Sequence, residues 1–133
     1  MQRTLFIVKP DAVERNLIGR ILAHVEAAGF RIVEARMETL ARTRAEEFYA
    51  EHLGKPFFPD LIGYMTSGRV LLVCLEGEDA VARLRETVGA TDPAQAAPGT
   101  VRREFGVSKQ RNSVHASDSP VSAEREVKLF FSK

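Results

Sequence analysis

The sequence has one cysteine and almost no net charge, and each of these shortages excludes a class of protein. A single cysteine, Cys74, cannot form a disulfide framework within the chain, and its place in the apolar run 70–75 is typical of a small buried thiol. With 19 basic and 18 acidic residues the formal net charge is +1, so no overall field draws the chain to nucleic acid or an anionic membrane. A site for anions would have to be local.

Long apolar runs are missing as well. No stretch approaches the roughly 20 apolar residues that cross a bilayer, and the first four residues lack the apolar core of a signal peptide. We therefore expect a cytoplasmic protein with no membrane partner. A chain of 133 residues with 44% hydrophobic and 28% charged residues has an ordinary globular composition, and at this length we expect a single domain over residues 1–133.

The glycine-rich loops that often bind nucleotides are also absent. There is no G-x-G-x-x-G motif, and residues 63–68 begin and end with glycine but are followed by Arg69 and Val70, not by the lysine and hydroxyl residue of a P-loop. A phosphate site in this chain would have to be built from side chains, from helix ends, or from both.

What the sequence does contain is an alternation of strand and helix patterns. Four segments rich in β-branched and aromatic residues, or alternating between apolar and polar residues, predict strands: residues 3–8, 30–40, 70–75 and 113–117. Two segments with apolar residues at helical spacing, each followed by glycine, predict helices: residues 17–28 and 81–88. This order predicts an α/β protein (an α+β sandwich) of the ferredoxin-like βαββαβ type, with a four-stranded antiparallel sheet.

A helical hairpin is expected as an insertion between the second and third strands. Thr43 followed by Glu46 is a capping-box pattern, which predicts a helix that begins there and carries Phe48, Tyr49 and Leu53. The segment 56–59, Pro-Phe-Phe-Pro, interrupts this helix, and a further helical turn or two is expected over residues 61–65.

The last third of the chain combines a long loop with two capped helices. Residues 90–100 contain two prolines and a glycine and are expected to lack regular structure; long ordered loops in small domains are often functional. Thr100 is expected to cap a short helix that runs to Phe105, and Ser122 is expected to cap the last helix, with Glu126 in its first turn.

One histidine, His115, is a candidate nucleophile. It lies in residues 112–118, Asn-Ser-Val-His-Ala-Ser-Asp, and follows a segment, 99–111, with four cations and one anion. A neutral imidazole is nucleophilic, and nearby cations suggest an anionic substrate. Taken alone, this pattern favours an ordinary surface or packing histidine, and two-residue metal sites such as His115 with Asp118 or His24 with Glu26 have too few ligands to be convincing.

Four groups of residues, in one order along the chain, resemble nucleoside diphosphate kinases. They are the segment 112–118, the opening segment 3–13 (Arg-Thr-Leu-Phe-Ile-Val-Lys-Pro-Asp-Ala-Val), the segment 55–59 (Lys-Pro-Phe-Phe-Pro), and residues 90–94 with 98–102. The similarity runs from Arg3 to about Phe131, nearly without gaps. It favours His115 as a functional residue where the local pattern did not.

The resemblance implies a function and a mechanism. Members of this family transfer the γ-phosphate of ATP or another nucleoside triphosphate to nucleoside diphosphates by a ping-pong reaction through a phosphohistidine, here expected at His115, and so maintain GTP, CTP, UTP and deoxynucleoside triphosphate pools. The implied partners are nucleoside di- and triphosphates, Mg²⁺ held mainly by phosphates and water without a direct protein ligand, and further copies of the chain in a tetramer or hexamer built from dimers. Nucleic acid is not expected as the main partner, although a nucleotide- or nucleic-acid-binding regulator on the same fold stays open as the alternative.

The resemblance also assigns roles to individual residues. Glu126 is expected to hold the second imidazole nitrogen with support from Ser117, and Tyr49 is expected beside the histidine. The residues expected to bind the nucleotide are Lys9, Phe57, Arg85, Thr91, Arg102 and Asn112, with Phe57 as the shelf for the base.

Three positions depart from the family pattern. Ala12 and Ala116 stand where glycine is common, which would be costly only if the backbone there required a positive φ. Lys109 stands where an apolar residue often contacts the base, so the base clamp would depend on a lysine stem.

Overall fold

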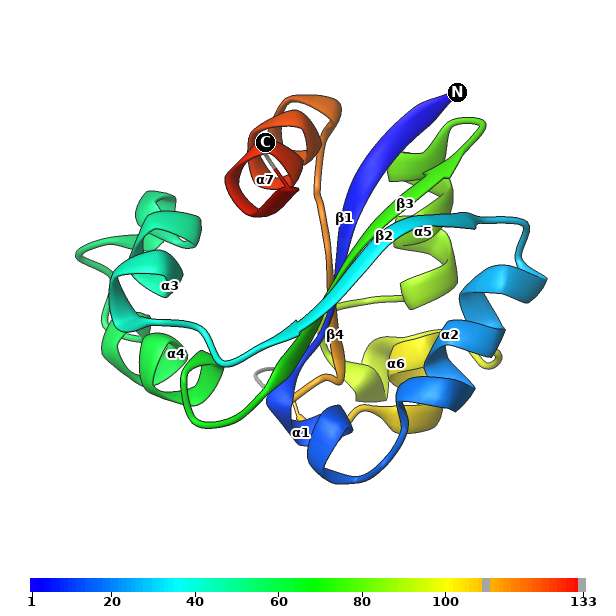
Figure 1. Cartoon of the computed structure of the whole chain (residues 1–133). Coiled ribbons are helices and arrows are strands. Elements are labelled where there is room, and N and C mark those ends of the chain that lie inside the picture. Colours follow the sequence, from blue (N-terminus) through cyan, green and yellow to red (C-terminus); the bar gives the residue numbers. More distant parts are fainter. Residues whose placement is uncertain (109–110, 132–133) are drawn as a thin grey trace.

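The computed structural model describes residues 1–108 and 111–131, and its central layer is a four-stranded antiparallel sheet in the order β2-β3-β1-β4 (Figure 1). The strands are β1 (Gln2–Val8), β2 (Arg31–Glu38), β3 (Val70–Gly77) and β4 (Val114–Ala116). The helices are α1 (Pro10–Glu14), α2 (Ile18–Ala27), α3 (Arg42–Phe48), α4 (Phe58–Met65), α5 (Ala80–Val88), α6 (Val101–Phe105) and α7 (Pro120–Phe131), with 3-10 turns η1 (Ala50–His52) and η2 (Pro93–Gln95). The expected ferredoxin-like α+β fold is confirmed.

Helices cover both faces of this sheet, and β1 lies at its centre. Because neighbouring side chains of a strand point to opposite faces, Phe6 and Val8 of β1 pack toward α2 and α5, whereas Leu5 and Ile7 pack toward α3, α4 and α7. All four side chains are fully buried. The central strand thus joins two hydrophobic cores, and its carboxyl end, where Lys9 follows, is fixed from both sides.

The inserted hairpin is present, but the predicted capping box is wrong. α3 begins at Arg42 with Ala41 at its N-cap and no side-chain cap, so Thr43 lies inside the first turn. The buried side chains of Leu40 and Phe48 set this register, because both must reach the core. Leu53, which was expected on this helix, lies beyond η1 and is 74% exposed.

Helix starts elsewhere also differ from the sequence pattern. α4 begins at Phe58, earlier than expected, because Pro59 is tolerated in a first turn. α7 begins at Pro120, and its cap is the hydroxyl of Ser119, which accepts the N–H of Ser122 at 3.1 Å, so Ser122 is not the cap and Glu126 is not in the first turn.

The remaining expectations for the last third are mixed. Thr100 caps α6 as predicted, accepting the N–H of Arg103. The segment 90–100 is not wholly irregular, because Asp92 caps the short turn η2. Among the described residues no helix is long and apolar enough to span a bilayer.

Candidate active site

His115 lies on β4, directly beside the central strand. β4 pairs antiparallel with β1, which places His115 opposite Ile7. The neighbours Val114 and Ala116 point into the core beneath α2 and α5, so the strand alternation turns His115 to the other face. There its ring meets the edge of Phe48 at a centroid distance of 4.9 Å and an interplanar angle of 77°. Strand pairing and this aromatic contact fix the imidazole.

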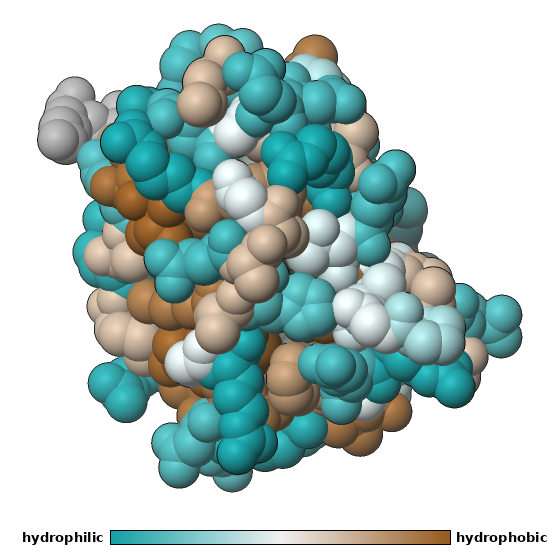
Figure 2. Space-filling model, turned by 90° about the vertical axis from the view of Figure 1, so that its right-hand side faces the viewer, coloured by the Kyte–Doolittle hydropathy of each residue, from teal (hydrophilic) through white to brown (hydrophobic). Residues whose placement is uncertain are grey.

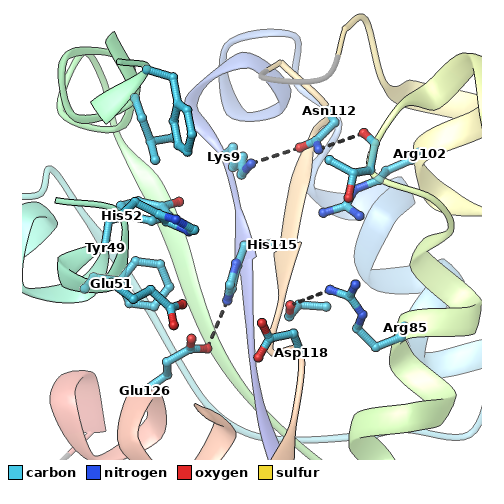
Figure 3. Close-up of a pocket in the computed structure, with 15 residues that line it drawn as sticks. Lys9, Tyr49, Glu51, His52, Arg85, Arg102, Asn112, His115, Asp118 and Glu126 are labelled. Carbon is cyan, nitrogen blue, oxygen red and sulfur yellow. Dashed lines mark hydrogen bonds and ion pairs between the residues drawn. The ribbon is translucent and has the colours of Figure 1, made fainter. Parts of the chain in front are cut away.

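A cavity of about 600 Å³ opens beside His115 and is walled by residues from distant parts of the chain (Figure 3). Its lining includes nine of the residues expected at the site: Lys9, Tyr49, Phe57, Arg85, Thr91, Arg102, Asn112, His115 and Glu126. Ser117, the remaining expected residue, is fully buried behind Glu126. The lining also includes Glu51 and His52, which the sequence patterns did not single out, and Asp118, which they raised only as a metal ligand with His115.

Glu126 holds one nitrogen of the imidazole. Its Oε1 lies 3.0 Å from His115 Nε2 and accepts the hydroxyl of Ser117 at 2.6 Å, and Ser117 in turn accepts the backbone N–H of Leu5. Burial alone would raise the pKa of Glu126, but the hydrogen bonds and charges around it, led by that of His115, lower the pKa overall. The group is therefore a carboxylate that accepts Nε2–H, and this tautomer leaves a lone pair on Nδ1.

His115 is uncharged at neutral pH. Burial lowers its pKa below the ordinary value, with a further contribution from the positive charges of Lys9 and Arg102, although Glu126 opposes the shift. A neutral imidazole with a free Nδ1 is a nucleophile.

Two buried cations face the same cavity. Lys9 follows β1 and donates from Nζ to Asn112 Oδ1 at 2.9 Å; burial, together with the charge of Arg102, lowers its pKa to about 7. Arg102, 5% exposed on α6, donates to the carbonyls of Gly89 and Val114, and burial lowers its pKa to about 10. Its Nε is buried without a partner among the described residues. A buried cation with an unused donor is suited to an anionic ligand.

The other polar residues frame this cationic region. Arg85 on α5 donates to the carbonyl of Ala116 at 3.3 Å, and Asn112 Nδ2 donates to the carbonyl of Thr91 at 3.1 Å. Tyr49 is buried, and burial, with the charge of Glu126, raises its pKa, so its hydroxyl remains a donor. That hydroxyl has no partner among the described residues.

An aromatic rim forms the outer wall. Phe57 is 46% exposed, unlike Phe58, which is buried, so the first of the two phenylalanines is the one available for stacking. The ring of His52 lies 5.5 Å from that of Phe57, and Lys55 Nζ lies 5.8 Å from its centroid. An exposed ring beside a cationic cavity suits a nucleobase joined to phosphates.

The departures from the family pattern cause no strain where they are described. Ala12 lies in α1 and Ala116 in β4, and neither has a positive φ; both are buried, so small size is what these positions require. Ser113, by contrast, has φ 75°, a feature that nothing in the sequence signalled. Lys109 lies outside the described residues.

The metal-site alternatives gain no support. The described residues contain no group of three or more His, Cys, Asp or Glu side chains that could hold a metal ion. His24 instead lies 3.8 Å from Glu104 on α6.

A ferredoxin-like sandwich with a neutral histidine, buried cations and an aromatic rim around one cavity defines a phosphotransferase that acts on nucleotides. Comparison with known proteins makes the assignment specific. The sequence model of the nucleoside diphosphate kinase family matches residues 2–133. The nucleoside diphosphate kinase of Halorhodospira halophila is 54% identical over 131 residues, 98% of this chain and 93% of that protein. The corresponding enzyme of Pelotomaculum thermopropionicum is 52% identical over 99% of this chain and 89% of its own length.

Solved structures agree with this result. The nucleoside diphosphate kinase of Aquifex aeolicus superposes with a TM-score of 0.96 at 46% identity, covering 98% of this chain and 95% of that one. That of Encephalitozoon cuniculi gives a TM-score of 0.97 at 37% identity over 100% of this chain and 90% of its own. The chain belongs to the nucleoside diphosphate kinase family, and it is a nucleotide-binding transferase that moves phosphate between nucleotides. A regulator that only binds nucleotides or nucleic acid is not favoured.

Proposed function

We propose that His115 carries the phosphate between two nucleotides, taking the γ-phosphoryl group of ATP or another nucleoside triphosphate and passing it to a nucleoside diphosphate. The observation that supports this most directly is the hydrogen bond between His115 Nε2 and Glu126, because it leaves Nδ1 as the nucleophilic atom. Such an enzyme maintains the pools of GTP, CTP, UTP and the deoxynucleoside triphosphates.

In the first half-reaction the Nδ1 lone pair attacks the γ-phosphorus, a nitrogen–phosphorus bond forms, and the bond from phosphorus to the bridging oxygen breaks with that oxygen keeping the electrons. The diphosphate leaves. In the second half-reaction a terminal oxygen of the acceptor diphosphate attacks the same phosphorus and Nδ1 recovers its electrons. Nε2–H stays bonded to Glu126 throughout, and this carboxylate stabilises the positive imidazolium of the intermediate.

The remaining cavity residues bind the nucleotide in this proposal. Phosphoryl transfer spreads negative charge over the transferring oxygens, so fixed donors supply most of the catalysis. Lys9, Arg85, Thr91 and Arg102 bind the phosphates, and Asn112 contacts the sugar and phosphate end of the nucleotide. Tyr49, which lines the same cavity as the histidine, donates its hydroxyl to the bound nucleotide, and Phe57 stacks on the base without selecting among bases.

Mg²⁺ fits this site as a companion of the nucleotide. The cavity wall offers the carboxylates of Glu51 and Asp118 but, in the described part of the chain, no cluster that would bind a metal by itself. A hard ion held mainly by phosphate oxygens and water matches that donor set, and it would neutralise charge on the β- and γ-phosphates.

We also infer that the chain is one domain over residues 1–133 and that it forms a homo-oligomer, a tetramer or hexamer built from dimers. β2 is an edge strand with β3 as its neighbour in the sheet. Apolar side chains of α2 and β2 reach the surface, among them Leu22 and Met37, which is 36% exposed, and Figure 2 shows hydrophobic residues gathered along one side of this face. We also infer a cytoplasmic location, where nucleoside di- and triphosphates are abundant.

The test is phosphoenzyme formation. Wild-type protein mixed with γ-labelled ATP and Mg²⁺ is expected to carry a label that is labile in acid and stable in alkali, and to lose it when a diphosphate is added. His115→Ala should not be labelled. An unlabelled wild type, or equal labelling of the variant, would contradict the proposal.

A further inference from the structure

Ser113 occupies a strained turn immediately before the strand that carries His115. Its φ is 75°, and the N–H of Val114 donates to the carbonyl of Asn112 at 2.9 Å, which closes a three-residue γ-turn. This conformation is rare and costly for residues other than glycine, and such strain persists only where surrounding contacts hold it. Ser113 is fully buried, so those contacts come from the protein.

Two residues from the start of the chain hold this turn. The backbone N–H of Lys9 donates to the carbonyl of Ser113 at 2.8 Å. The guanidinium of Arg15, just after α1, donates from Nη2 to the Ser113 hydroxyl at 3.2 Å and to the carbonyl of Phe105 at 2.6 Å. One side chain thus joins the end of α6 to the turn.

Arg15 is itself fixed by a buried carboxylate. Its Nη2 lies 3.1 Å from Asp11 Oδ2, and its Nε donates to the Asp11 carbonyl at 3.2 Å. The other carboxylate oxygen of Asp11 accepts the hydroxyl of Tyr64 from α4. Asp11 is 7% exposed and Tyr64 8% exposed, so the anchor is shielded from water.

The turn carries Asn112, whose side chain faces the cavity. Asn112 accepts a hydrogen bond from Lys9 Nζ and donates one to the carbonyl of Thr91 (Figure 3). Arg15 is not among the described residues that line the cavity. It can therefore affect the site only indirectly, through residues such as Ser113 that it contacts.

We propose that Arg15 is a positioning residue, which, held by Asp11 and Tyr64, keeps the Ser113 turn in place and thereby holds Asn112 where it binds the sugar of the nucleotide. This inference rests on the proposed function, in which Asn112 contacts the sugar. Loss of Arg15 removes one of the two contacts that hold the turn and loosens Asn112, while the pairing of β4 with β1 keeps His115 in place and the Lys9 N–H still donates to the Ser113 carbonyl.

The experiment compares two acceptors on the phosphorylated enzyme: GDP, and 2′,3′-dideoxy-GDP, which lacks the sugar hydroxyls. Arg15→Met removes the donors and keeps the aliphatic stem, Ser113→Ala removes the acceptor, and Arg20→Met makes the same chemical change at an exposed arginine. We expect Arg15→Met to lower kcat/KM for GDP by up to about tenfold, the upper end of what loss of one neutral hydrogen bond between Asn112 and the sugar costs, and to change it less than about twofold for the dideoxy acceptor. The loss for GDP should appear mainly in KM.

Ser113→Ala should reproduce the selective loss, and the double variant should be no worse than Arg15→Met alone, because both remove one interaction. Arg20→Met should match the wild type. Equal losses with both acceptors would show a general structural defect and overturn the inference, as would additive losses or an unchanged preference in Arg15→Met. If the wild type is phosphorylated by labelled ATP but uses GDP and the dideoxy acceptor equally well, Asn112 has no role in sugar binding and the inference fails. If the wild type is not phosphorylated at all, the proposed function itself fails.

Discussion

Lys9 shows how far a single side chain departs from its ordinary chemistry in this fold. Its ammonium group is buried at the end of the central strand, near Arg102, and burial lowers its pKa from 10.5 to about 7. Above pH 7 the free enzyme therefore holds Lys9 mostly as a neutral amine. A bound polyphosphate favours the charged form and raises the pKa again.

Nucleotide binding is consequently expected to take up protons at pH 8. The nucleotide is fully ionised there, Lys9 is mostly neutral in the free enzyme, and binding protonates it, so uptake should approach about one proton per site. Calorimetry of ADP binding in buffers of different ionisation enthalpy measures this number. At pH 6 Lys9 is already charged and its uptake should disappear, and Lys9→Arg should bind without it at pH 8. Equal uptake by wild type and Lys9→Arg would contradict the assignment.

For single residues, the sequence predicts the chemical groups that line the site better than it predicts the residues that hold them in place. The resemblance singles out His115, Glu126 and the cations, and the structure places them around one cavity, whereas their roles stay predictions. The sequence does not single out Ser113, because a serine at positive φ looks like any other serine, or His52, because nothing in its local sequence shows that it faces the cavity. Such roles depend on contacts between residues far apart in the chain.

Among the secondary-structure predictions, the first residues of the helices differ most from the structure. Hydroxyl and carboxyl residues near the starts of α3 and α7 make several caps plausible locally, but α3 begins after Ala41 without a side-chain cap and α7 is capped by Ser119 rather than Ser122. The strands were predicted well because apolar runs and two-residue alternation record burial directly. α1 was missed because it has five residues, and its proline reads equally as a strand end and a first helical position.

The two serines at the start of α7 provide a matched test. Ser119→Ala removes the cap and is expected to lower the free energy of unfolding by about 1 kcal/mol. Ser122→Ala keeps the N–H that donates to Ser119 and should change stability by less than about 0.5 kcal/mol. Urea denaturation followed by circular dichroism measures the free energy of unfolding of both variants. A larger loss in Ser122→Ala than in Ser119→Ala would show that Ser122 is the cap.

Two glycines, Gly89 at the C-terminal end of α5 and Gly63 within α4, allow a second matched comparison. A Cβ on Gly89 would lie 2.6 Å from Thr100 Oγ1 and require an alanine at φ 92°, and the Gly89 carbonyl also holds Arg102. Gly89→Ala is therefore expected to destabilise the protein by about 2 kcal/mol or more and to raise KM for nucleotides. Gly63→Ala, in α4 with open space around it, should stabilise the protein by up to about 1 kcal/mol. Thermal unfolding and steady-state kinetics of both variants check this, and similar effects would refute the steric argument.

The whole molecule is expected to associate through its open sheet edge. Unpaired strand edges with apolar neighbours favour contact with another chain. Light scattering should give a mass that is a multiple of 14.8 kDa. Met37→Glu, on β2, should weaken association about tenfold or more, whereas Val121→Glu, at an 81% exposed site on α7, should leave it unchanged. A monomer, or equal effects of the two changes, would exclude β2 as the contact.

The site combines residues from the first strand, β1, with residues from the last part of the chain, and this affects when the protein can become active during its synthesis. The ribosome makes β1 first, but Lys9 meets Asn112 only 103 residues later, and His115 meets Glu126 only when α7 exists. A nascent chain that stops before α7 contains the cations without an oriented nucleophile. If His115 carries the phosphate as proposed, the growing polypeptide is not expected to form a phosphoenzyme until α7 has left the ribosome, and folding that depends on such distant pairings is slow compared with that of a helical bundle.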